Sequence, residues 1–125
     1  MGEIRKYSCT CGYEEELCVG SGMNAINFAF VEQLFPEEYE ELAKKKEAGE
    51  NISFQLSNII GNCQICKKLH AIAALRYTLP DGKVTTVRKK CPICDVDVAV
   101  QTDEDHIRCP KCGQMMTWQH AGLWD

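Results

Sequence analysis

Alternation of apolar and polar side chains is the most frequent pattern along this chain, and it predicts β-hairpins. Residues 3–18 fit one hairpin, with cysteines at its tip. Residues 70–79 and 83–88 fit a second hairpin, because residues 80–82 (Pro-Asp-Gly) form a strong turn sequence between two strand-like stretches.

The C-terminal third continues this pattern. Valines alternate cleanly with other residues over 96–100, and a polar turn follows at 102–105. Residues 106–108 then lead back as the partner strand. Residues 115–119 are expected to form a closing strand. The second half of the chain is therefore predicted to consist of short antiparallel hairpins.

Between the first two hairpins the period changes towards that of a helix. Residues 25–35 satisfy both a helical and a strand spacing, and we favour a helix with Asn24 as its N-cap. Residues 36–48 predict a clearer helix. Pro36 suits its first position, acidic residues occupy its first turn, lysines its last, and Gly49 suits its end. We expect a small α+β fold, metal-stabilised, with a helical insert over about 24–50.

The lack of membrane-spanning and secretory signals leads us to expect a reducing compartment. It has 125 residues, no apolar run of membrane-spanning length and no apolar leader at its N-terminus. We therefore expect a cytoplasmic protein. Nine cysteines in such a protein are more typical of metal binding than of disulfides.

Eight of these cysteines form four tight pairs. One pair is C-x-C and three are C-x-x-C: Cys9/Cys11, Cys63/Cys66, Cys91/Cys94 and Cys109/Cys112. Four thiolates bind one tetrahedral zinc ion, and each C-x-x-C turn supplies two of them. The sequence therefore predicts two Zn²⁺ ions per chain, with these eight residues as the ligands.

The last two pairs resemble a zinc ribbon. They are separated by 14 residues that hold one predicted hairpin, and a proline follows the first cysteine of each pair. Gly113 after the last pair tolerates a positive φ, and Asp95 is among the better substitutes at the equivalent position. This resemblance to ribbons with a rubredoxin-like knuckle covers residues 91–113. It implies one zinc site made by Cys91, Cys94, Cys109 and Cys112.

The first two pairs would then form the other site, from Cys9, Cys11, Cys63 and Cys66. The opening Y-x-C-x-C-G-Y resembles a ribbon knuckle with one residue deleted. The whole chain is similar to small bacterial proteins of no established activity that join a split N-terminal ribbon to a C-terminal one. This similarity implies a split ribbon over 1–90, containing the helical insert, and a second ribbon over 91–125.

Other residues compete for a place in the N-terminal site. Cys18, the unpaired ninth cysteine, can replace Cys9 or Cys11, although a non-ligand position suits its strand context better. His70 follows Cys66 by four residues and is a second alternative ligand. His106 and His120 have no cysteine at a useful spacing.

The pattern predicts a binding or scaffold module rather than an enzyme. The sequence holds no hydrolase, P-loop or dinucleotide motif, and closed four-cysteine sites are structural. We expect a protein partner, with the tryptophans near the C-terminus capping the core or forming an anchor.

Two other classes remain open. A nucleic-acid-binding ribbon would use residues 88–90 and Lys111, but the net charge of −4 disfavours a phosphate partner. A rubredoxin-like electron-transfer protein would hold iron in place of zinc. No membrane association is expected.

Overall fold

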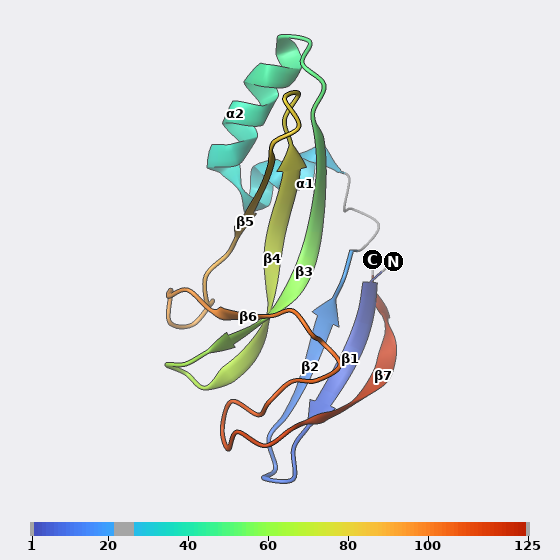
Figure 1. Ribbon diagram of the computed structural model, residues 1–125, viewed down its shortest axis with the longest axis vertical. Helices are drawn as coiled ribbons and strands as arrows, with labels where there is room; N and C mark the ends of the chain where they lie inside the picture. Colours follow the sequence, from blue (N-terminus) through green and yellow to red (C-terminus); the bar gives the residue numbers. More distant parts are fainter. Residues whose placement is uncertain (1, 22–26, 125) are drawn as a thin grey trace.

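The computed structural model describes residues 2–21 and 27–124 and contains two sheets and two helices. Figure 1 shows an elongated molecule, with the helices at one end and a three-stranded sheet at the other. The elements are β1 (Gly2–Ser8), β2 (Glu14–Val19), α1 (Phe28–Leu34), α2 (Pro36–Glu47), β3 (Ser53–Cys63), β4 (Lys68–Thr78), β5 (Val84–Arg88), β6 (Ala99–Gln101) and β7 (Thr117–Trp124). The fold is sheet-dominated, as expected, and its helix content is small.

The three-stranded sheet joins the two ends of the described chain. Its order is β2-β1-β7, so the first hairpin is confirmed and the C-terminal strand pairs with the N-terminal one. Trp124 donates its indole N–H to the carbonyl of Val19, and Trp118 packs against the core with the Arg5 guanidinium 3.8 Å from its ring centroid. Trp118 thus covers part of this core, and Trp124 ties β7 to the end of β2.

The four-stranded sheet is built on one long hairpin. Its order is β5-β4-β3-β6, and β3 pairs with β4 from Ser53↔Thr78 to Cys63↔Lys68. The hairpin predicted around residues 80–82 is confirmed, because β5 returns alongside β4. Strand β3 had no counterpart in the sequence prediction.

The helices lie where the sequence placed them. Helix α2 begins at Pro36 and ends at Glu47, with Gly49 at φ 83° just beyond. Helix α1 is capped by Asn27, whose side chain accepts from the N–H of Ala29. The predicted cap, Asn24, lies outside the described residues.

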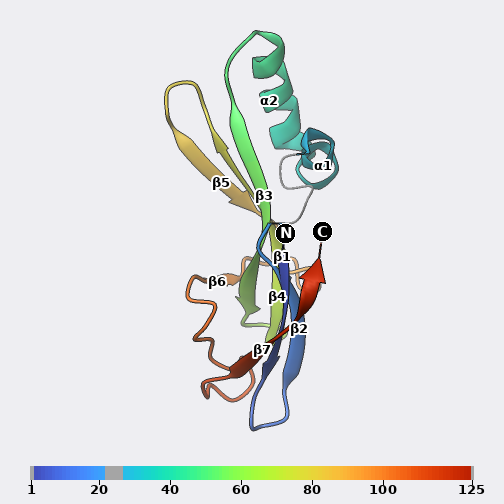
Figure 2. The same cartoon turned by 90° about the vertical axis from the view of Figure 1, so that its right-hand side faces the viewer.

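The helices pack on the end of the long hairpin that is distant from the three-stranded sheet, as Figure 2 shows from the side. A hydrophobic cluster joins them to β3 and β4 through Val31, Leu42, Leu56 and Leu75, all of which are buried. None of the helices in the described residues has the length and apolar character needed to cross a membrane.

The hairpin predicted over residues 96–108 is wrong. Strand β6 pairs with Ile60–Asn62 of β3 rather than with residues 106–108. Val98 packs beside Gly61, and a side chain in place of this glycine would collide with Val98. Ile107 instead enters the core of the three-stranded sheet. The two ends of this segment therefore pack into different cores: Val98 into the cluster beside β3 and Ile107 into the core of the three-stranded sheet.

Candidate metal centres

The eight paired cysteines gather into two groups of four. In each group the sulfur atoms all lie within 4.8 Å of one another. Cluster 1 consists of Cys9, Cys11, Cys109 and Cys112, and cluster 2 consists of Cys63, Cys66, Cys91 and Cys94.

This pairing corrects the one expected from the sequence. The first cysteine pair shares one site with the last pair, and the two middle pairs share the other site. Neither the ribbon expected over residues 91–113 nor its N-terminal counterpart therefore forms a site. The cause is the sheet topology. Pairing of β7 with β1 carries the last knuckle to the β1–β2 turn, and the tip of the β3–β4 hairpin meets the loop that follows β5 (Figure 1).

All four cysteine turns share one backbone feature. The residue after the second cysteine has a positive φ in each: Gly12 at 100°, Lys67 at 53°, Asp95 at 54° and Gly113 at 80°. This conformation turns the chain sharply enough to direct two sulfurs of a turn to one point, and it favours glycine. For Asp95 and Gly113 this role was expected from the sequence.

Cluster 1 is the more exposed of the two. Cys11 and Cys112 are exposed, whereas Cys109 is buried. Cys9 lies 3.3 Å from Cys112, and Cys11 lies 3.7 Å from Cys109, measured between sulfur atoms. Thr10 donates its hydroxyl to the side-chain carbonyl of Gln114 at 2.7 Å, which joins the two turns directly.

Cluster 2 is more enclosed. Cys63 and Cys91 are buried, and the sulfurs of Cys66 and Cys91 are 3.8 Å apart. His70, on β4, places its Nε2 atom 3.4 Å from the Cys66 sulfur and 3.5 Å from the Cys91 sulfur. His70 is outside the set of mutually close sulfurs, so it lies beside the cluster rather than within it.

Backbone hydrogen bonds and crowding shift the pKa values of two cluster 1 thiols in opposite directions. The backbone N–H of Cys11 lowers the pKa of Cys9 to about 7. The pKa of Cys112 is raised to about 12: the backbone of Gln114 lowers it, but the neighbouring Cys9 sulfur and desolvation outweigh that effect.

In cluster 2 the pKa values of two thiols also shift in opposite directions. The backbone N–H of Cys66 lowers the pKa of Cys63 to about 7. Desolvation and then the neighbouring Cys63 sulfur raise the pKa of Cys94 to about 12. Without a cation, four thiolates in one place oppose one another's ionisation, and a central metal ion removes that opposition.

The sulfur spacing fits such an ion. In a tetrahedral site with metal–sulfur bonds of about 2.3 Å, adjacent sulfurs lie about 3.8 Å apart. The distances of 3.7 Å in cluster 1 and 3.8 Å in cluster 2 agree with that value, and the Cys9–Cys112 distance of 3.3 Å is somewhat shorter. Each cluster can therefore hold one metal ion with four sulfur ligands.

The other candidate ligands lie apart from the clusters. Cys18 is half-buried on β2 and belongs to neither group. His106 bonds to Asp103 at 2.9 Å, and His120 bonds to Glu3 at 2.8 Å. From the sequence, His70 was expected only as an alternative ligand, and no sequence signal predicted its contacts with the sulfurs of Cys66 and Cys91.

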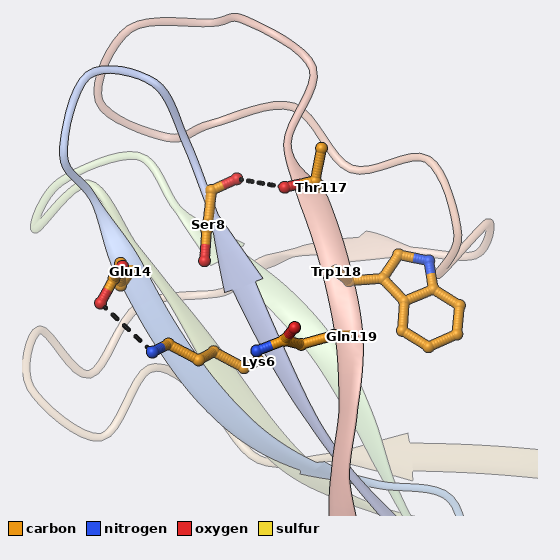
Figure 3. Close-up of a pocket in the computed structure, with 6 residues that line it drawn as sticks. All are labelled: Lys6, Ser8, Glu14, Thr117, Trp118 and Gln119. Atoms are coloured by element: carbon orange, nitrogen blue, oxygen red, sulfur yellow. Dashed lines mark hydrogen bonds and ion pairs between the residues drawn. The ribbon is translucent and has the colours of Figure 1, made fainter.

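A shallow groove on the outer face of the three-stranded sheet is polar. It is lined by Lys6, Ser8, Glu14, Thr117, Trp118 and Gln119, as shown in Figure 3. Lys6 pairs with Glu14 at 3.6 Å, and Thr117 donates to the carbonyl of Ser8 at 3.4 Å. The indole of Trp118 points away from these groups in the figure. These contacts describe a solvated sheet surface.

The two clusters of four cysteines fit a zinc-ribbon-like metal-binding protein. No protein-family model, curated protein or solved structure matches this chain.

Proposed function

We propose that this chain is a zinc-binding protein with two structural Zn(Cys)4 sites. The observation that carries the proposal is the convergence of eight cysteines, from four distant turns, into two groups of four sulfurs. Closed sets of four cysteines with no carboxylate or water position are typical of structural zinc. In this reading the ions fix the fold and perform no catalysis.

The structural role follows from what each ion joins. Cys9 and Cys112 are 103 residues apart in sequence, so an ion in cluster 1 ties the β1–β2 turn to the cysteine turn that precedes β7. An ion in cluster 2 ties the tip of the β3–β4 hairpin to the loop after β5. Linking distant segments restricts the unfolded chain, and metal binding adds directly to folding free energy.

Metal analysis of the purified protein tests this proposal. Elemental mass spectrometry should give two zinc ions per chain, and X-ray absorption should show four sulfur ligands around each. Cys109→Ser should lose one ion because it removes a cluster 1 ligand, and Cys18→Ser is the matched control that should retain both. A protein that binds iron would instead be coloured, which would favour the electron-transfer alternative.

We further propose that the protein contacts another protein through cluster 2. The support is a pair of exposed apolar side chains: Ile65 is 66% exposed and Ile93 is 62% exposed. Each precedes the second cysteine of one turn of cluster 2, so the two isoleucines flank the same metal site. Exposed apolar side chains that gather at one place on a rigid support are typical of contact surfaces.

Comparison of variants in cross-linking pulldowns tests this role. Ile65→Ser with Ile93→Ser should lose the partners that wild type captures while keeping two metal ions. Val84→Ser is the matched control, because Val84 is 47% exposed on β5, outside both clusters. Unchanged capture by the double variant would contradict a contact at cluster 2.

The nucleic-acid alternative has weaker support. The Lys89 ammonium lies 4.9 Å from the ring centroid of Phe35, and that of Lys111 lies 6.0 Å from the ring of Tyr13. The two lysines lie beside different aromatic rings, and the negative net charge of the chain disfavours a phosphate partner. Salt-dependent retention on nucleic acid would favour this alternative over a protein partner.

A further inference from the structure

His70 joins the two cysteine turns of cluster 2. Its Nε2 atom lies 3.4 Å from the sulfur of Cys66, in the β3–β4 turn, and 3.5 Å from the sulfur of Cys91, in the loop after β5. These distances are within the range of hydrogen bonds to sulfur. One side-chain nitrogen therefore contacts one ligand from each half of the site.

We propose that His70 is a positioning residue that donates its Nε2–H to the Cys66 and Cys91 thiolates of the metal-loaded cluster 2. The inference rests on the metal-binding function proposed above. A neutral imidazole has one N–H donor, and thiolates bound to a divalent ion retain net negative charge that such a donor stabilises. The bond holds both turns around the ion and slows its release.

The four cysteines of cluster 2 leave no coordination position for the imidazole. They form a complete tetrahedral set without His70, whose nitrogens are not part of the group of mutually close ligand atoms. Cys91 also accepts from a backbone group, the N–H of Cys94 at 3.4 Å. His70 adds a side-chain donor from outside the cysteine turns. Such donors beside metal ligands are common in metal sites.

Cluster 1 provides an internal comparison. Within residues 2–21 and 27–124, the other two histidines bond to carboxylates, His106 to Asp103 and His120 to Glu3. The Cys109 sulfur has a backbone donor, the N–H of Lys111 at 3.4 Å, but no histidine beside it among these contacts. Loss of the His70 donor should therefore affect the ion of cluster 2 and spare the ion of cluster 1.

The test measures zinc release from the full chain by a coloured chelator, with pulse alkylation to identify which cysteines become free. In His70→Phe, release from cluster 2 should be about 10-fold or more faster than in wild type, while release from cluster 1 should be unchanged. His70→Gln, which keeps a donor, should restore part of the difference. His106→Phe is the matched control and should behave as wild type.

A second measurement is independent of the variants and covers the case in which His70→Phe fails to fold. Nitrogen-15 NMR of zinc-loaded wild type should show His70 with its proton on Nε2. A proton on Nδ1 alone, or direct zinc–nitrogen coordination, would overturn the proposal. So would release from cluster 2 of His70→Phe at the wild-type rate. Failure of the wild type to bind two ions would instead contradict the proposed function on which this inference rests.

Discussion

At the scale of single residues, the Tyr13 hydroxyl links the cluster 1 turn to the other sheet. It accepts a hydrogen bond from the backbone N–H of buried Leu69 and donates one to the carboxylate of Glu15, both at 2.9 Å. Leu69 follows the cluster 2 turn on β4, so this hydroxyl couples the two metal-bearing regions. β5 pairs with β4 only over Ala74–Thr78, so the buried N–H of Leu69 lies beyond that pairing and needs another acceptor.

Tyr13→Phe should therefore destabilise the folded protein by about 1–3 kcal/mol, because the Leu69 N–H loses its partner. Chemical denaturation of the metal-loaded protein measures this change. Tyr39→Phe, on helix α2, is the matched control and should cost less than about 0.5 kcal/mol, because its hydroxyl bonds only the exposed Glu32 carboxylate. Equal stability of Tyr13→Phe and wild type would show that the bond contributes nothing.

The same residue predicts a pH dependence. Burial raises the pKa of Tyr13 above its ordinary value of 10.0. The unfolded chain therefore ionises first as pH rises, and the stability that Tyr13 contributes is lost above about pH 10. Tyr13→Phe should show a smaller alkaline loss of stability than wild type.

At the scale of elements, local signals predicted what local interactions determine. Pro36 and Gly49 delimited α2, and residues 80–82 placed the β4–β5 turn, because capping and turn preferences act within a few residues. Strand β3 was not predicted, because its alternation ends after five residues, where Ser57-Asn58 is followed by Ile59-Ile60. The partner of β6 could not be predicted either, since Gly61 accommodates Val98 only once distant strands are paired.

The contact between Gly61 and Val98 predicts how β6 is held. Gly61→Ala places a methyl group against Val98, so it should destabilise the protein by about 1–3 kcal/mol and increase hydrogen exchange in β6. Val98→Ala in addition should recover part of that loss, because it removes the colliding group. Additive effects of the two changes would contradict the packing described here.

At the scale of the whole molecule, the cysteine pairs are nested: the first pair shares a site with the last, and the two middle pairs share the other site. The sequence identified the eight cysteines, because their spacing within each turn is local. It did not identify which turns share a site, because the pairing of β7 with β1 decides that, and residue spacing had favoured adjacent turns. Each cluster consequently combines one pair from before residue 90 with one pair from after it.

Nesting predicts the behaviour of a chain cut in the exposed β4–β5 turn, within residues 80–83. Each fragment then carries one pair from each cluster, so two metal ions bridge the fragments. The cut protein should remain associated in mild denaturant with metal and separate when a chelator removes it. Fragments that separate with one ion each would indicate sites made within each half.

Cadmium NMR tests the central claim most directly. In protein loaded with cadmium-113, each metal resonance should correlate with the β-protons of its own four cysteines. We predict two resonances, one correlated with Cys9, Cys11, Cys109 and Cys112, the other with Cys63, Cys66, Cys91 and Cys94. A resonance correlated with Cys91, Cys94, Cys109 and Cys112 together would contradict the nested pairing and restore the ribbon expected from sequence alone.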